Sequence, residues 1–159
     1  MERISDTHTL DQATAYVILR MGRLLRMDLH RTLRNAKHET RIGENQVEIT
    51  PEQWFILFRL YEQDGLSQSD LADKLLQDHP NITRMIDALE AKTIIRRDND
   101  PEDRRRYVLH LSEEGRRLVE RLFPVVVARR MQIFNGIAAE EIEQLHATLN
   151  VIEKNLLDS

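Results

Sequence analysis

Two groups of polar side chains in the middle of the chain have residue types that bind nucleic acids. The first follows Asp78 and consists of short or forked hydrogen-bonding groups on the outward side of a predicted helix; its members are Asn81, Thr83, Arg84 and Asp87. Asparagine can form paired hydrogen bonds with adenine, and arginine can do so with guanine or a phosphate. The second group is the arginine run at residues 104–106, which follows a stretch of turn-forming residues at 99–103. Together they predict a surface that neutralises phosphates and contacts base edges.

The spacing of apolar residues predicts the elements that position these groups. Asp78 is a favoured N-terminal cap, and the apolar residues after it recur at i, i+3, i+4 and i+7, which indicates a helix over residues 79–90 with one buried side. A capping box at residues 67–70 predicts a shorter helix before it. Residues 94–97 and 107–111 are predicted to form a hairpin. Two helices followed by a basic hairpin are the parts of a winged helix-turn-helix, in a mainly α fold with a small β-hairpin (α+β).

Composition limits the class of protein. The chain has 159 residues, enough for one or at most two domains, and no cysteine for a disulfide framework or thiol sensor. It has no apolar run near the roughly 18 residues that cross a bilayer, and no signal-peptide core at its N-terminus. We therefore expect a cytoplasmic protein with no membrane partner.

The charge distribution constrains how DNA could bind. The net charge is −4, and residues 66–106 carry eight basic and nine acidic groups, a net charge of −1. Affinity must therefore come from a few well-placed arginines and should fall steeply as salt is added.

The flanking segments are predicted to be mostly helical. Residues 10–38 keep helical apolar spacing, residues 39–49 are polar and predict a loop, and Thr50 begins a helix through a capping box with Gln53. Within the last helix the apolar residues follow a 3-4-3-4 spacing, which is typical of a helix that packs on another. They are Ile142, Leu145, Leu149, Ile152 and Leu156.

One short chain cannot easily bury such a face, so we expect the two ends to form a dimer interface. The predicted organisation is an N-terminal helix and loop at 1–49, a DNA-binding region at 50–112 and C-terminal dimerisation helices at 113–159. In the last of these, Ser112 should cap the first helix, Pro124 should kink or interrupt it and Gly136 should end it. The aromatic residues expected on buried faces are Trp54, Phe58, Tyr61 and Tyr107.

Several motifs occur in order at matching separations: TPEQW at 50–54, SQSDLA at 67–72, DNDPEDRR at 98–105 and LSEEG at 111–115. Through them the chain resembles the MarR family of bacterial transcription regulators. The resemblance implies a homodimer that binds a palindromic double-stranded operator, often to repress, and that a small aromatic effector often releases. Leu76 and Thr93 stand where the family usually has glycine.

The resemblance also implies which residues contact DNA. Residues 79–84 would enter the major groove, and Arg105, oriented by Asp103, would reach the minor groove. Replacing Arg105 with alanine should then weaken operator binding by about tenfold or more. Arg104 and Arg106 are equally well explained as a solvated strand edge. The full set of expected contacts is Ser67, Gln68, His79, Pro80, Asn81, Thr83, Arg84, Asp103, Arg104, Arg105 and Arg106.

An effector would bind between the dimer helices and the DNA-binding region. The candidates are Arg23, Met27, His30, Trp54 and Phe58, each of which ordinary packing or surface exposure explains equally well. A stripe of arginines on the predicted N-terminal helix is explained more simply as a solvated helix face than as a binding site. Its members are Arg20, Arg23, Arg31 and Arg34.

Two other functions compete with DNA binding. An enzyme is disfavoured because the chain has no nucleophile motif, no glycine-rich phosphate loop and no metal-ligand spacing among its histidines, so no catalytic residue, metal or cofactor is expected. A winged-helix module that binds protein rather than DNA is the alternative. The acidic total and Asp87 favour it, whereas Arg84 and the run at 104–106 favour DNA.

Overall fold

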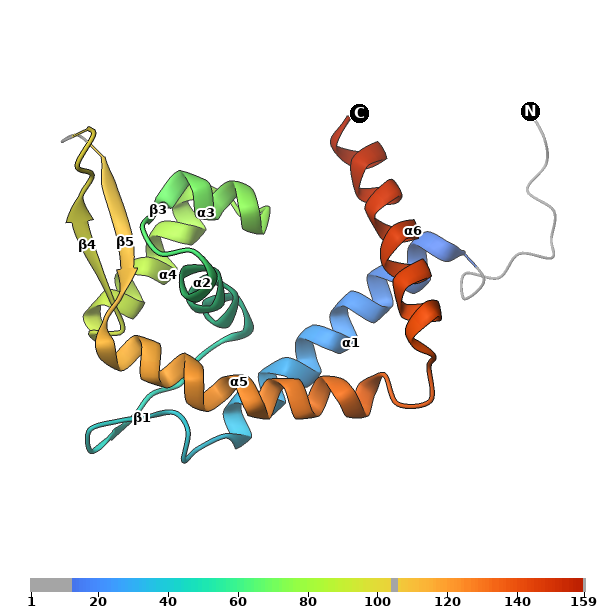
Figure 1. Ribbon diagram of the computed structural model, residues 1–159, viewed down its shortest axis with the longest axis horizontal. Helices are drawn as coiled ribbons and strands as arrows, with labels where there is room; N and C mark the ends of the chain where they lie inside the picture. Colours follow the sequence, from blue (N-terminus) through green and yellow to red (C-terminus); the bar gives the residue numbers. More distant parts are fainter. Residues whose placement is uncertain (1–12, 104–105, 159) are drawn as a thin grey trace. The chain divides into compact units, whose positions relative to one another are not determined.

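A computed structural model describes residues 13–103 and 106–158 of the chain. They form long helices and short antiparallel strands, as a mainly α winged helix requires (Figure 1). In chain order the elements are α1 (Thr14–Asn35), β1 (Arg41–Ile42), β2 (Asn45–Gln46), α2 (Pro51–Glu62), β3 (Leu66–Ser67), α3 (Gln68–Leu75), α4 (His79–Ala91), β4 (Ile95–Asn99), β5 (Tyr107–Leu111), α5 (Glu113–Ile133) and α6 (Ala139–Leu157). Of the described residues, those up to Val126 form one compact unit and those from Val127 onward a second. Within the described part of the chain, no helix is both long and apolar enough to cross a membrane.

Side-chain caps fix where the three central helices begin. The Thr50 hydroxyl accepts from the Gln53 N–H at 3.2 Å, and the Gln53 side chain accepts from the Thr50 N–H at 3.1 Å. Ser67 and Asp70 form the same reciprocal pair at the start of α3, at 3.1 and 2.9 Å. Asp78 caps α4 by accepting from the Asn81 N–H at 2.8 Å. All three predicted caps are confirmed.

The core lies where α2, α3, α4, the sheet and the first half of α5 meet. Ile82, Ile86 and Leu89 of α4 are fully buried, which confirms the predicted apolar side of that helix. Leu118 and Leu122 of α5 are also fully buried. The predicted boundary after residue 112 therefore falls inside the first compact unit, because the start of α5 completes its core.

A three-stranded sheet flanks the helices, in the order β3-β5-β4, and all its pairs are antiparallel. Leu66 pairs with Leu109, which confirms the small strand predicted at Leu66. Leu109 and Leu111 are buried as the alternation predicts, but Tyr107 is 58% exposed. Tyr107 faces Asn99 at the last pair before the hairpin turn, beyond the reach of the core.

Other local predictions were wrong. The segment at 39–49 contains the β1–β2 hairpin, whose turn uses Gly43 at φ +59°, a conformation that glycine adopts without strain. Tyr61 is exposed, with the Arg116 guanidinium 5.4 Å from its ring centre. Pro124 does not interrupt α5, which is continuous from Glu113 to Ile133, and since Pro124 is exposed, water can bond the preceding-turn carbonyl that has lost its N–H donor; a kink at this position stays a prediction.

Helix α4 is bounded on both sides by left-handed backbone. Leu76 at φ +49° ends α3, and Thr93 at φ +57° follows α4. At both positions the MarR family usually has glycine. In left-handed backbone any other residue places its Cβ atom too close to the following carbonyl oxygen. A β-branched residue such as Thr93 is especially unfavourable in this conformation.

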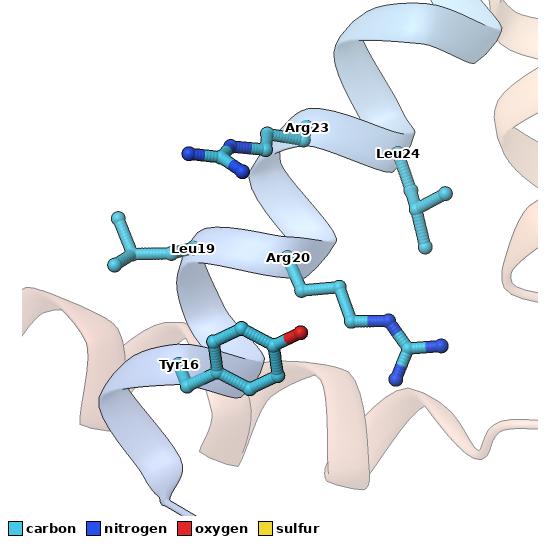
Figure 2. A pocket seen from close by; sticks show the side chains of 5 residues that line it. All are labelled: Tyr16, Leu19, Arg20, Arg23 and Leu24. Atoms are coloured by element: carbon cyan, nitrogen blue, oxygen red, sulfur yellow. The ribbon is translucent and has the colours of Figure 1, made fainter. Parts of the chain in front are cut away.

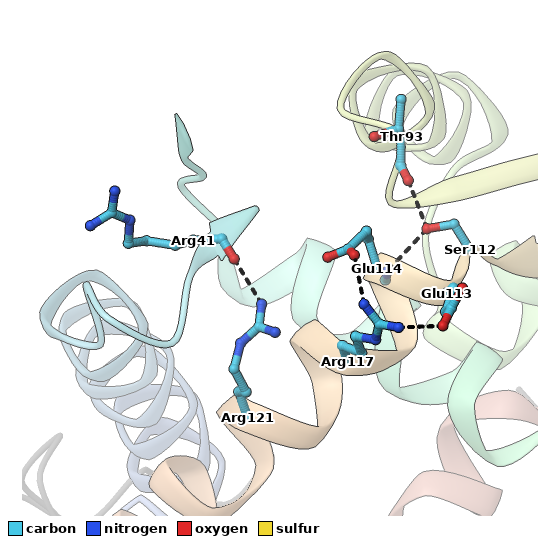
Figure 3. A network of polar contacts seen from close by, with 8 residues as sticks. Arg41, Thr93, Ser112, Glu113, Glu114, Arg117 and Arg121 are labelled. Atoms are coloured by element: carbon cyan, nitrogen blue, oxygen red, sulfur yellow. Dashed lines mark hydrogen bonds and ion pairs between the residues drawn. The ribbon is translucent and has the colours of Figure 1, made fainter. Parts of the chain in front are cut away.

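The junction after the hairpin is held by Ser112 (Figure 3). Its hydroxyl donates to the Thr93 carbonyl at 2.7 Å and accepts from the Gly115 N–H at 2.9 Å, which confirms the predicted cap of α5. A Cβ atom at Gly115 would lie 2.0 Å from the Ile94 carbonyl oxygen, so only glycine fits.

The terminal helices differ from this core. Among the described residues of α6 none is buried, including the predicted seam, and in α1 only Leu33 is. The exposed apolar residues of α1 are Val17, Ile18, Leu19, Met21, Leu24, Leu25 and Met27.

Candidate nucleic-acid interface

The fold gathers five of the eleven predicted contact residues on α4, where they lie with Asp87 on the side away from the core. His79, Pro80, Arg84 and Asp87 are exposed, and Asn81 and Thr83 are half-buried. We call these six residues the reading face. They occupy the N-terminal two-thirds of the helix, whose opposite side is anchored in the core by Ile82, Ile86 and Leu89.

Hydrogen bonds hold Asn81 at the centre of the reading face. Its amide nitrogen donates to the Gln77 side-chain oxygen at 2.7 Å. Its amide oxygen accepts from the Arg84 guanidinium at 3.5 Å, a long contact. The chain from Gln77 to Arg84 limits the rotamers of Asn81, and the amide must exchange one of these partners to pair with a base.

The residues predicted at the start of α3 have structural contacts. Ser67 is 5% exposed and its hydroxyl belongs to the cap with Asp70, so its burial does not agree with the DNA contact expected of it. Gln68 donates to the Thr83 hydroxyl, which in turn donates to the His79 carbonyl at 2.8 Å. Gln68 and Thr83 therefore fix how α3 and α4 pack, because they join the two helices directly.

The wing is the hairpin of β4 and β5. Two backbone bonds close its turn: the Asp100 N–H donates to the Arg106 carbonyl at 2.9 Å, and the Arg106 N–H donates to the Asp103 carbonyl at 2.8 Å. The side chains of Asp103 and Arg106 are exposed. Arg104 and Arg105 lie outside the described residues, so the pairing of Arg105 with Asp103 stays a prediction.

Arg106 of the wing acts through its charge on Asp70 of α3. Hydrogen bonds from the Ser67 hydroxyl and N–H lower the pKa of Asp70, and the positive charges of Arg106 and Lys74 lower it further. Asp70 therefore stays ionised at the N-terminus of α3, where a negative charge stabilises the helix.

Arg97 is a residue that sequence reasoning did not single out. From β4 it forms ion pairs with Asp87 and Glu90, both on α4 (Figure 1 shows the two elements). Partial burial acts to lower the pKa of Arg97, but its two carboxylate partners outweigh burial and the pKa is raised. Sequence alone gives a weak signal for this contact, because the pairing depends on which face of β4 the side chain occupies.

The predicted effector residues Arg23, Trp54 and Phe58 have different surroundings. Arg23 lines a pocket of about 250 Å³ on α1 with Tyr16, Leu19, Arg20 and Leu24 (Figure 2). Trp54 is 4% exposed and stacks on Phe58, which stacks on Phe123 at a ring-centre distance of 5.4 Å. This geometry is core packing. Met27 is exposed and His30 half-buried. Among the described residues, His, Asp and Glu nowhere gather in threes that could hold a metal.

Comparison with known proteins gives a consistent result. Residues 49–107 match the sequence model of the MarR family. MepR of S. aureus in complex with DNA is 25% identical, with a TM-score of 0.77 over 93% of this chain and 99% of that one. MepR in a DNA-binding conformation is 27% identical, with a TM-score of 0.73 over 89% and 97%. CouR from Rhodococcus jostii RHA1, bound to p-coumaroyl-CoA, is 24% identical, with a TM-score of 0.78 over 92% and 95%.

Proposed function

We propose that the protein is a sequence-specific DNA-binding transcription regulator of the MarR family, whose sequence model matches residues 49–107. It acts in the cytoplasm, has no enzymatic activity and binds a palindromic operator as a homodimer, commonly to repress. The observation that carries this proposal is the reading face: polar side chains on an exposed helix that is anchored in a core and lies beside a hairpin. MepR, a similar protein, has been crystallised with DNA.

Arg84 and Asn81 are the residues with the chemistry to read bases. Arginine pairs with guanine or a phosphate, and asparagine with adenine. Arg106 is exposed at the wing and adds a phosphate contact, as the adjacent Arg104 and Arg105 are expected to do. If a dimer makes about six to ten phosphate contacts, the logarithm of affinity falls with the logarithm of salt at a slope of roughly −5 to −9.

A second copy of the chain completes the DNA-binding unit. Two reading faces must lie about 34 Å apart to enter successive major grooves on one side of a duplex. The apolar residues of α1 and α6 that a single chain leaves exposed offer the surface for this association. The proposed organisation therefore keeps residues 1–49 and 113–159 for dimerisation and 50–112 for DNA.

A small aromatic molecule with an acidic group is the proposed effector. The pocket on α1 has the chemistry for it, because Leu19, Leu24 and the Tyr16 ring supply apolar contacts and Arg23 supplies a cation. Such a ligand can lower DNA affinity only if it binds one arrangement of the two subunits better than another.

The proposal is tested by fluorescence anisotropy on a duplex selected from random DNA. Arg84→Ala should weaken binding by about tenfold, because it removes a contact made by the reading face. Arg105→Ala should weaken it by about as much if the wing reaches the minor groove. Arg59→Ala is the matched control, since Arg59 is exposed on α2 and pairs with Glu62 of its own helix at 3.0 Å. Unchanged affinity in Arg84→Ala would contradict the reading face, and failure to select any duplex would favour the protein-binding alternative.

A further inference from the structure

Asp87 presents a problem for the proposed function. It lies three residues after Arg84, and residues at this spacing are neighbours on one side of a helix. Its side chain is 58% exposed. An unpaired carboxylate there would repel the phosphates that Arg84 approaches. Glu90 lies a further three residues along and adds a second negative charge on the same side.

Arg97 meets both carboxylates from the neighbouring strand. One nitrogen of its guanidinium binds Asp87 and another binds Glu90. The Arg97 side chain is only 22% exposed, so the ion pairs are less screened by water than pairs on an open surface. A guanidinium presents its donors in a rigid fork, which lets one residue hold two acceptors in fixed positions.

Arg96 shows that this arrangement is specific to Arg97. Successive residues of a strand point to opposite faces of a sheet. Arg96 is accordingly 61% exposed and pairs with Asp98 of its own strand at 3.0 Å. The two adjacent arginines therefore carry the same charge at almost the same place in the chain, but only one of them acts on the reading face.

We propose that Arg97 is a positioning residue for DNA binding: it neutralises Asp87 and Glu90 and fixes the wing strand β4 to the C-terminal half of α4. This inference rests on the proposed function. Arg97 lets a helix that carries acidic residues approach a phosphate backbone. Because α4 and β4 are joined by its guanidinium, the reading face and the wing also keep a constant separation, so both can engage one duplex together.

The test compares full-length variants on the same selected duplex at several salt concentrations. Arg97→Gln removes the charge but keeps a long side chain, and Arg96→Gln removes the same charge from the opposite face. Arg97→Gln should lose about tenfold in affinity at low salt, because two carboxylates then repel the DNA, and the loss should shrink as salt screens them. Arg96→Gln should lose about threefold or less, as expected for a distant exposed charge.

A rescue variant separates charge from folding. The triple variant Arg97→Gln with Asp87→Asn and Glu90→Gln should recover most of the affinity lost by Arg97→Gln. Thermal unfolding of each variant identifies any loss that comes from a destabilised fold, and the rescue would not repair such a loss.

The outcomes of the test are distinct. Equal losses in Arg97→Gln and Arg96→Gln, or no recovery in the triple variant, would overturn the role of Arg97 while leaving DNA binding intact. If the unsubstituted protein binds no duplex, the proposed function fails and this inference fails with it.

Discussion

The winged-helix core and the terminal helices differ in whether their apolar side chains are buried within one chain. Between Leu33 and Leu122 the chain buries most of its large apolar side chains within itself. In α6 and in most of α1, comparable side chains remain exposed. The core therefore covers its apolar surface within one chain, whereas the terminal helices carry apolar surface that a second copy can cover. DNA contact and association are thus assigned to different parts of one chain.

The largest expected effect contrasts a glycine of the core with one of α1. Gly115→Ala should destabilise the protein by about 3 kcal/mol, because the added Cβ would meet the Ile94 backbone 2.0 Å away. Gly22→Ala is the matched control: nothing lies within 4 Å, and alanine favours helix by about 1 kcal/mol. Thermal unfolding measures both. Similar melting temperatures for the two variants would contradict the packing described at the junction of β5 and α5.

A charge placed on α6 tests what the terminal helices do. Leu145→Glu should convert a dimer to a monomer, because Leu145 is an exposed member of the apolar seam and a carboxylate there cannot be buried against a second helix. Sedimentation equilibrium gives the mass, and far-ultraviolet circular dichroism should show that the helices of the core persist. Glu143→Gln, on the same helix outside the seam, should remain dimeric. If the unsubstituted protein sediments as a monomer, α6 does not serve dimerisation.

The smallest effect concerns the strained end of α4. Thr93→Gly should stabilise the protein by about 1 kcal/mol, since glycine adopts φ +57° without the Cβ clash and the carbonyl bond to Ser112 is retained. Thr93→Ala keeps the Cβ atom and should recover less. The melting temperatures of the two variants measure this difference. A melting temperature for Thr93→Gly below that of the unsubstituted protein would show that the turn is not strained.

The parts of the fold that the sequence predicts are those governed by neighbouring residues. The caps at Thr50, Ser67 and Asp78 and the buried side of α4 each depend on side chains within one or two turns. The β1–β2 hairpin was predicted to be a loop because its two-residue strands are too short to show alternation. The exposure of Tyr61 and Tyr107 was missed because periodicity gives the side of an element and not the extent of the core.

The candidate site shows the same limit. Residues of the reading face follow one another along α4, so their spacing identified them. The neutralisation of Asp87 could not be inferred, because it requires knowing that Arg97, and not Arg96, points from β4 toward α4. Long-range ion pairs of this kind depend on strand register and on helix packing, which one sequence does not specify.

The most direct test of the central claim is a hydroxyl-radical footprint on a duplex selected from random DNA. The account predicts two symmetry-related protected segments on one face of the duplex, about 10 base pairs apart from centre to centre, as two copies of α4 would produce. Protection should weaken at both segments together in Arg84→Ala. A single unsymmetrical protected segment, or protection that Arg84→Ala leaves unchanged, would contradict it.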